Sequence, residues 1–360
     1  MNFKLRSRSI PLNPFLVILV LVMAISISDL NASDSTFRYH YQLLGKEDQQ
    51  LYKRIQDCVE LCGDTLQDVP DSFAQIDHIF DYVLLDNPRF FYCLPSYTLV
   101  TNTRNDIPYR HDMTFSYEKI EKKNERTRNV VDSILTILQS IDDPRSDYDI
   151  VKGVYEYLGR NCLYDEAYPD QSLYSVLVEK RGVCAGFAKS FAYIMELAGI
   201  PCVTATGTLE GQRHSWNMVR LGDNWYHIDV TASTSLADSK DAFYSFLCVS
   251  DQQLFKTHAA DSNTPLPSAI SGDKEYFQRN GRRMNIWIYD EFLKMLEDAC
   301  SKSESTLTIK FGTQTAMDNA KLVLFGQSRI FDAFDSAGIS KSTVDYSIEK
   351  ELLLLSIKLK

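Results

Sequence analysis

The spacing of hydrophobic positions predicts a small α/β domain in the first third of the chain, over residues 33–140. In three segments, apolar residues recur at every third or fourth position in a polar background, which is the period of an amphipathic helix. In two other segments they alternate with polar residues, which is the period of a strand. We therefore expect helices over residues 46–62, 71–85 and 118–141, and strands over residues 97–101 and 109–117.

The pattern is denser over residues 141–262, where we expect a second domain that contains both helices and strands. A Gly-Ile-Pro sequence at 199–201 ends one helical pattern, and alternating segments follow it. The short stretch 221–224 separates two of these segments and predicts a hairpin turn. The expected elements are helices over residues 148–160, 173–179, 185–198 and 251–258, and strands over residues 202–209, 214–220, 225–231 and 244–249.

A loop containing Pro, Ser, Asn and Gly at residues 261–272 is interpreted as a linker to a third domain, residues 273–360. Its patterns again mix the two periods, so this domain is also expected to be α/β. We expect helices over residues 286–300 and near 316–324, and strands over residues 306–311 and 352–359.

The first 32 residues have the pattern of an export signal. Three positive residues, Lys4, Arg6 and Arg8, precede an apolar run from Phe15 to Ile27. This run is short for a bilayer-spanning helix, which needs about 20 residues. We expect residues 1–32 to be a cleaved signal peptide, with a retained N-terminal anchor as the alternative. In both cases the protein is predicted to be secreted or anchored outside the cytoplasm, and to meet the membrane only through such an anchor.

Composition narrows the class of protein. The formal net charge is −10, and the positive charges form no long run. Nucleic-acid binding depends on a basic surface that displaces counterions, so we exclude that class. The eight cysteines are scattered along the chain and define no disulfide framework. Cys58 and Cys62 lie one helical turn apart and could pair, bind metal or be buried; burial as small hydrophobic residues is the interpretation we favour.

Cys184 is the first candidate for chemistry. It lies where the Gly-containing sequence Arg181-Gly182-Val183 leads into a predicted helix. Free backbone N–H groups and the helix dipole at such an end favour an anion, which lowers the pKa of a thiol. The same N–H groups can stabilise the oxyanion of a tetrahedral intermediate. Taken alone, however, a free cysteine is more often a buried packing residue.

His214 and Asp229 are the proposed partners of Cys184. If Arg220 faces Trp225 across the predicted hairpin, His214 lies opposite Thr231 and one diagonal step from Asp229. A one-residue slip would place the two side chains on opposite faces, so the prediction depends on this turn. A carboxylate that accepts one imidazole N–H fixes the tautomer and leaves the other nitrogen for the thiol proton.

The remaining polar residues are weaker candidates. His227 shares the predicted face of the hairpin and is the alternative base. His258 is expected to cap or pack against the predicted helix 251–258. The acidic residues between 142 and 149 lack the ordered spacing and the glycine of a calcium loop, and no zinc spacing is present. We predict no metal and no cofactor.

Three motifs resemble those of the bacterial transglutaminase-like superfamily. The sequence 181–188, RGVCAGFA, is similar to the family's Cys motif; HSWNMV at 214–219 resembles its His motif, and WYHIDVT at 225–231 its Asp motif. The order Cys, His, Asp and the spacings of 30 and 15 residues also fit. The resemblance covers about residues 145–260, with a weaker likeness to exported members in the first domain.

The resemblance implies a papain-like α+β core, with the Cys helix packed on an antiparallel sheet and a Cys184–His214–Asp229 triad. It implies an enzyme, a cysteine peptidase, amidase or acyltransferase that hydrolyses or transamidates peptide or isopeptide bonds, and its substrate would be a peptide or protein such as a cell-wall peptide. Tyr164 resembles an aromatic residue that shapes the family's site, and we add Trp216 as a second substrate-binding candidate. The family also includes members that have lost activity, so a non-catalytic cell-envelope or adhesion module is the alternative.

Overall fold

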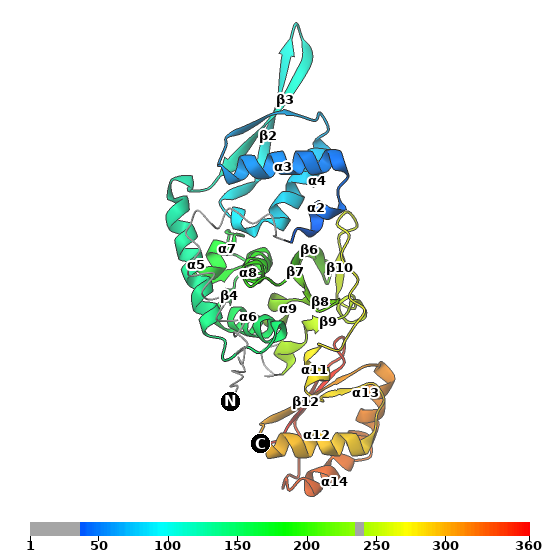
Figure 1. The fold of residues 1–360 in the computed structure, drawn as a ribbon. Coiled ribbons are helices and arrows are strands. Elements are labelled where there is room, and N and C mark those ends of the chain that lie inside the picture. The colour runs from blue at the N-terminus through cyan, green and yellow to red at the C-terminus, as the bar shows by residue number, and fades with distance from the viewer. Residues whose placement is uncertain (1–36, 235–240) are drawn as a thin grey trace, which may run out of the picture. The chain divides into compact units, whose positions relative to one another are not determined.

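The computed structural model describes residues 37–234 and 241–360 (Figure 1). The chain divides into two compact units, Met1–Val154 with Tyr193–Ile200, and Tyr155–Ala192 with Pro201–Lys360. The predicted export signal, residues 1–32, lies outside the described residues. Within the described ranges, no helix combines the length and the apolar character that crossing a bilayer requires.

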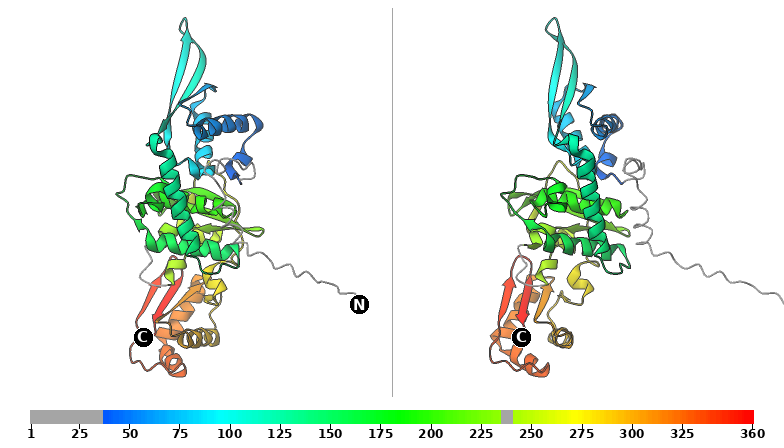
Figure 2. Two further views of the ribbon diagram at one scale, coloured as in Figure 1. Left: turned by 60° about the vertical axis from the view of Figure 1, so that its left-hand side comes forward. Right: turned by 90° about the vertical axis from the view of Figure 1, so that its left-hand side faces the viewer.

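The first unit contains a three-stranded antiparallel sheet of order β1-β3-β2 with helices packed beside it. Its core includes the fully buried side chains of Ile55, Ile79, Met113 and Ile134. Figure 2 shows the β2–β3 hairpin extending beyond the helices of this unit. The elements are α2 (Tyr39–Leu43), α3 (Lys46–Glu60), β1 (Thr65–Val69), α4 (Phe73–Asp86), β2 (Cys93–Arg104), β3 (Ile107–Tyr117) and α5 (Lys123–Gln139), with 3-10 turns at Pro88–Phe90 and Ile120–Lys122.

The second unit is built on a five-stranded antiparallel sheet of order β10-β6-β7-β8-β9. The hairpin register is the predicted one, because Arg220 pairs with Trp225 and Met218 pairs with His227. The elements from α6 to β10 are α6 (Asp147–Asn161), β4 (Leu163–Tyr164), α7 (Leu173–Leu177), β5 (Arg181–Gly182), α8 (Cys184–Leu197), β6 (Cys202–Leu209), β7 (Gln212–Leu221), β8 (Asn224–Ile228), α9 (Val230–Thr234), a 3-10 turn (Ala242–Tyr244), β9 (Leu247–Val249), α10 (Asp251–Leu254) and β10 (His258–Ala260).

Two predicted elements in this sheet region are present but shorter than predicted. The strand expected over residues 225–231 ends at Ile228, because Asp229 caps a new helix by accepting a hydrogen bond from Ala232 N at 2.9 Å. The helix expected over residues 251–258 is a single turn, α10, and His258 instead begins strand β10. The expected strand 244–249 is likewise shorter, since a 3-10 turn occupies its first residue.

Strand β10 lies unusually close to its neighbour β6. A Cβ atom on Gly207 would stand 2.0 Å from the carbonyl oxygen of Ala259, so only glycine allows this pairing. The pairing places His258 opposite Leu209 on β6, while Gly207 pairs with His214 on β7. Two histidines that are 44 positions apart in the sequence are thereby brought to neighbouring strands.

The C-terminal part of the second unit is a four-stranded sheet of order β11-β12-β14-β13, packed against helices. The predicted helix 286–300 and strands 306–311 and 352–359 are present, whereas β11, α14 and β13 were not predicted. Phe292, Leu307, Phe334 and Leu355 are fully buried in its core. Its elements are α11 (Tyr276–Arg279), β11 (Arg283–Met284), α12 (Tyr289–Ser301), β12 (Thr306–Phe311), α13 (Gln314–Lys321), a π-helical turn (Leu322–Gly326), α14 (Arg329–Ser336), β13 (Tyr346–Glu349) and β14 (Leu354–Lys358).

Candidate active site

Cys184 is the first residue of α8 and is half-buried. The helix is held in place from two sides. On one side, a Cβ atom on Gly186 would stand 2.9 Å from Ser172 O, so glycine is needed for this close approach. On the other side, Asn217 of β7 donates from Nδ2 to Ala188 O at 3.0 Å. The start of α8 is therefore fixed against the strand that carries His214.

His214 and Asp229 are in direct contact. The Nε2 atom of His214 lies 2.6 Å from Asp229 Oδ2, and both side chains are buried. Because Nε2 faces the carboxylate, Nδ1 is the nitrogen left for Cys184, and His214 acts on the thiol pKa through a side-chain hydrogen bond and its charge. The three residues expected from the sequence are thus brought together.

Asp229 is held by more groups than the sequence suggested. Its Oδ1 atom accepts hydrogen bonds from Thr231 Oγ1 at 3.0 Å and from Ala232 N at 2.9 Å. Its Oδ2 atom meets a second histidine, since His258 Nε2 lies 2.9 Å away. Each carboxylate oxygen therefore has two partners, which fixes the orientation of the carboxylate toward His214.

His258 is the site residue that the sequence reasoning missed. Its other ring nitrogen, Nδ1, lies 2.8 Å from Thr257 Oγ1, and the ring is buried. No local signal could have identified it, because its approach to Asp229 depends on the long-range pairing of β10 with β6. The expectation that it caps or packs against a helix was wrong.

The pKa shifts at the three residues favour an ion pair. Burial raises the pKa of Cys184, but hydrogen bonds from His214 and from the backbone of Ser215 and Ala185, with the charge of His214, bring it below the ordinary value. Burial lowers the pKa of His214, but Asp229 and Cys184 raise it to about 10. The two histidines beside Asp229 overcome its burial and hold the pKa of that carboxyl well below its usual range. A thiolate and an imidazolium can therefore coexist at neutral pH.

Other cysteines in the described residues have the opposite electrostatics. Burial raises the pKa of Cys93 to about 12 and that of Cys162 to about 11, and it raises the pKa of the fully buried Cys248 further still. All eight cysteines are free. Cys58 and Cys62, which might have paired, are half-buried free thiols. A lowered thiol pKa is thus a property of the position of Cys184 and not of the fold as a whole.

The start of α8 also supplies backbone donors. The first N–H groups of a helix have no carbonyl partner within it, and the first backbone bond of this helix runs from Phe187 N to Val183 O at 3.1 Å. The N–H of Ala185 is directed at the thiol of Cys184. Donors in this position are suited to the stabilisation of negative charge on sulfur and on a carbonyl oxygen bound beside it.

Both ring nitrogens of His227, the alternative base, have hydrogen-bond partners other than Cys184. Its Nδ1 atom accepts a hydrogen bond from Trp216 Nε1 at 3.1 Å, and its Nε2 atom lies 2.8 Å from Asp251 Oδ1. Burial lowers the pKa of His227 despite the neighbouring carboxylate. Asp251 in turn accepts from Ala269 N at 3.0 Å, so this second pair anchors the segment 261–272. His227 is therefore a structural residue.

The two substrate-binding candidates lie in different surroundings. Tyr164 is half-buried and is placed by the pairing of β4 with β5, which sets it opposite Gly182. Burial and the nearby Cys184 raise its pKa to about 12. Trp216 stacks on the His214 ring, with centroids 6.3 Å apart, but only 1% of it is exposed. Contact of Tyr164 with a substrate remains a prediction, whereas the burial of Trp216 disfavours such contact and indicates packing under His214.

One group of side chains in the described part of the chain has the composition of a metal site. Ligand atoms of His214, Asp229 and His258 all lie within 4.8 Å of one another. However, Asp229 Oδ2 already lies at hydrogen-bond distance from both imidazoles, and Oδ1 is used by Thr231 and Ala232. A metal would have to displace these hydrogen bonds, so the arrangement fits a hydrogen-bonded triad better than a metal centre.

Comparisons with known proteins find similarity to transglutaminase-like proteins. Residues 136–230 match the transglutaminase-like superfamily. The kyphoscoliosis peptidases of Mus musculus and Homo sapiens are each 25% identical to this chain in an alignment of 138 positions, which covers 33% of this chain and 21% of the relative. The chain therefore spans about a fifth of the length of these relatives. A solved TGase structure is 20% identical, with a TM-score of 0.26 over 38% of this chain and 44% of its own. Residues 136–230 are therefore similar in sequence to the transglutaminase-like superfamily. The described structure of this stretch contains both helices and antiparallel strands, as in the α+β class.

Proposed function

We propose that this protein is a cysteine-dependent acyl-transfer enzyme acting on peptide or isopeptide amide bonds, with Cys184, His214 and Asp229 as its catalytic triad. The observation that carries the proposal is the contact of His214 Nε2 with Asp229 Oδ2 at 2.6 Å, with Cys184 at the start of α8 as the third residue. The pKa shifts of the three residues favour the same role. The pKa of the thiol is lowered, the pKa of the imidazole is raised to about 10, and the carboxylate between two histidines stays ionised.

In the first step, the Cys184 thiolate attacks the amide carbonyl carbon, and a C–S bond forms while negative charge moves to the carbonyl oxygen. Backbone N–H groups at the start of α8 stabilise that charge. The intermediate collapses as the C–N bond breaks, and His214 Nδ1 gives its proton to the leaving amine. Asp229 holds the imidazole in the required orientation throughout, with His258 and Thr231 fixing the carboxylate.

The thioester is then resolved by water or by an amine. In hydrolysis, His214 takes a proton from water, the oxygen attacks the thioester carbon, and the C–S bond breaks to return the thiolate. Crosslinking follows the same path with a lysine-type amine as the nucleophile. Hydrolysis is the favoured outcome, because water is always available and a second amine needs a binding site of its own.

The substrate is proposed to be a peptide or protein met outside the cytoplasm, with cell-wall peptides as the first class to screen. This location rests on the charged start and apolar run of residues 4–27. The alternative, a non-catalytic envelope module on the same fold, would be favoured by the absence of a triad residue, and all three are present.

A thiol-directed activity probe tests the proposal. Wild-type protein and the Cys184→Ala variant are incubated with the probe, and separate, unlabelled samples of both are screened against a panel of cell-wall peptides and proteins. We expect Cys184-dependent labelling and Cys184-dependent release of product from at least one substrate. Equal labelling of the two proteins at low pH, or substrate turnover that survives Cys184→Ala, would contradict the proposal.

A further inference from the structure

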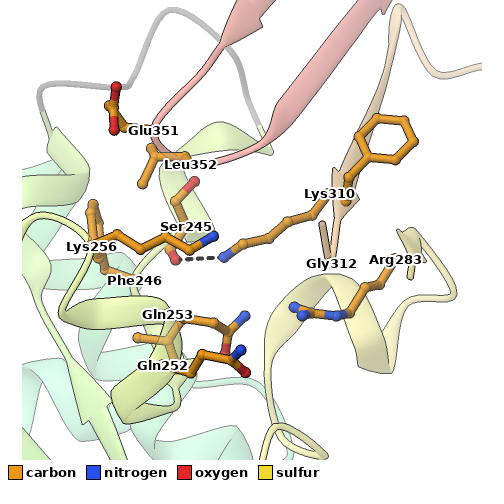
Figure 3. A pocket seen from close by; sticks show the side chains of 12 residues that line it. Ser245, Phe246, Gln252, Gln253, Lys256, Arg283, Lys310, Gly312, Glu351 and Leu352 are labelled. Atoms are coloured by element: carbon orange, nitrogen blue, oxygen red, sulfur yellow. Dashed lines mark hydrogen bonds between the residues drawn. The ribbon is translucent and has the colours of Figure 1, made fainter. Parts of the chain in front are cut away.

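A cavity in the second unit, separate from Cys184, is lined by hydrogen-bond donors. Its volume is about 70 Å³, far below the roughly 300–1,000 Å³ of pockets for drug-sized ligands. It therefore has room for a compact group and not for a nucleotide. Figure 3 shows the amines of Lys256 and Lys310, the guanidinium of Arg283 and the amide of Gln253 directed toward one space.

Lys310 on β12 is the buried member of this group. It is 5% exposed, and its Nζ atom donates to Ser245 O at 3.1 Å and lies 3.2 Å from Glu275 Oε1. An ammonium has three protons, so these two partners leave one for the cavity. Burial lowers the pKa of Lys310, and the charges of Arg283 and Lys256 lower it further, while Glu275 raises it. Arg283 and Lys256 are thus close enough to Lys310 for their charges to act on it.

The charge balance of the cavity favours an anion. Three cations surround it, and the two carboxylates near them are Glu275 and Glu351. Glu275 is shared, because it lies 3.2 Å from Lys310 and 3.5 Å from Arg283. Lys256 makes no hydrogen bond among the described residues, and Glu351 is the carboxylate that raises its pKa against the effects of burial and Arg283. One positive charge therefore remains without a matching carboxylate.

Gln253 gives the second, independent observation. Its Oε1 atom accepts from Ser250 N at 3.0 Å and completes the capping box of α10. This bond fixes the orientation of the amide, and its Nε2 atom is then buried with no hydrogen-bond partner among the described residues. A buried donor without an acceptor is destabilising, so a ligand that accepts a hydrogen bond here would be stabilised.

We propose that this cavity is a binding site for a phosphate-type oxyanion, held by Gln253 Nε2, Lys256, Arg283 and Lys310. A tetrahedral oxyanion offers acceptor oxygens in several directions, which matches donors that approach from α10, the segment after it, β11 and β12. A single carboxylate has acceptors in one plane and leaves part of this set unused. The group is either free phosphate or the phosphate of a larger molecule whose remainder stays outside the cavity.

Calorimetric titration of the full chain with inorganic phosphate, at constant ionic strength in chloride, tests the site. We expect saturable binding to one site and weaker binding of acetate. Gln253→Glu keeps the acceptor of the capping box but replaces the Nε2 donor with a negative oxygen. Lys256→Met removes an exposed cation, so folding is not at risk. Each variant should weaken phosphate binding by about tenfold or more, while Lys294→Met, an exposed cation on α12, should bind as wild type does.

The result separates the two sources of phosphate and can overturn the proposal. Binding of phosphoserine with an affinity similar to that of inorganic phosphate supports a phosphate carried by a larger molecule, and exclusion of phosphoserine supports the free ion. Absence of saturable phosphate binding, or binding that Gln253→Glu and Lys256→Met leave unchanged, overturns the site. Acetate binding as tight as phosphate binding overturns the tetrahedral preference. None of these readouts depends on Cys184 or on turnover.

Discussion

Two of the histidine–aspartate contacts at the five-stranded sheet, His214–Asp229 and His227–Asp251, have similar lengths, yet the pKa values of their imidazoles shift in opposite directions. His214 lies 2.6 Å from Asp229 and has its pKa raised to about 10, whereas His227 lies 2.8 Å from Asp251 and has its pKa lowered. Both rings are buried, and burial by itself lowers the pKa of each. The carboxylate alone therefore does not decide the outcome.

The difference lies at the second ring nitrogen of each histidine. In His227, Nδ1 accepts the indole N–H of Trp216, and an atom that accepts a hydrogen bond cannot also carry a proton. In His214, the second nitrogen faces the thiol of Cys184, whose negative charge favours protonation of the ring. The comparison teaches that Asp229 and the Cys184 thiolate together raise the pKa of His214 above the effect of burial, whereas Asp251 alone does not do so for His227. The first pair is therefore suited to catalysis, and the second is a structural bond.

The largest expected effect comes from removal of the thiol. Cys184→Ala should abolish acyl transfer, with a loss of about 10⁴-fold or more, because no other group replaces the nucleophile. The measurement is the initial rate of product release from any substrate found. Cys300→Ala is the matched control, since burial raises the pKa of that half-buried thiol. A rate in Cys184→Ala close to that of Cys300→Ala would show that Cys184 is not the nucleophile. The His214–Asp229 pair would then have no catalytic role to distinguish it from the His227–Asp251 pair.

Neutralising the two aspartates separately should give very different losses. Asp229→Asn is expected to reduce kcat by about 10³- to 10⁴-fold, because an amide no longer fixes and stabilises the imidazolium. Asp251→Asn should leave kcat within about threefold but lower the free energy of unfolding by about 1–2 kcal/mol, since it disturbs bonds to His227 and Ala269. Measurement of kcat and of urea unfolding curves for both variants distinguishes the two effects. Similar rate losses in both variants would mean that the pairs are not functionally distinct.

Removal of the His258 imidazole should reduce kcat by less than Asp229→Asn does and by more than Asp251→Asn does. His258→Asn deletes the imidazole that shares Asp229 Oδ2 with His214, and kcat should fall by about tenfold while KM changes little. A positioning role also predicts a changed pH profile of kcat, because Asp229 would then be balanced by His214 alone. An unchanged profile together with a loss of stability would show that His258 is only a packing residue.

Among these substitutions, Trp216→Phe is expected to have one of the smallest effects on the rate. Trp216→Phe keeps a ring beside His214 but removes the N–H that holds His227 in its neutral form. The free energy of unfolding should fall by about 1–2 kcal/mol, and both kcat and KM should stay within about threefold. A large rise in KM would instead support the substrate contact that the burial of this residue disfavours.

Chelation gives a further test of the triad against a metal centre at His214, Asp229 and His258. Activity is expected to be unchanged after prolonged dialysis against EDTA, because hydrogen bonds already occupy both oxygens of Asp229. The measurement is the rate before and after dialysis. A loss of activity that Zn²⁺ or another divalent cation restores would favour the metal site.

Much of the site could be predicted from sequence, because a short turn between neighbouring strands determines how its residues meet. The turn at 221–224 sets the pairing of Arg220 with Trp225 and brings His214 and Asp229 together. The strand predicted over residues 225–231 is present but ends at Ile228, since β-branched neighbours concealed that Asp229 caps α9. His258 and the cavity around Lys310 could not be predicted, because each depends on contacts between segments far apart in the chain.

The pH dependence of Cys184 alkylation tests the central claim most directly. Iodoacetamide reacts with the thiolate, so the rate, followed by mass spectrometry of the Cys184 peptide, should rise as pH increases through the pKa of this thiol. In the wild type we expect that midpoint to lie clearly below about 8.5, the value of an ordinary thiol, and to move upward in His214→Ala. A midpoint near that ordinary value in both proteins would contradict the claim that His214 and Cys184 form an ion pair.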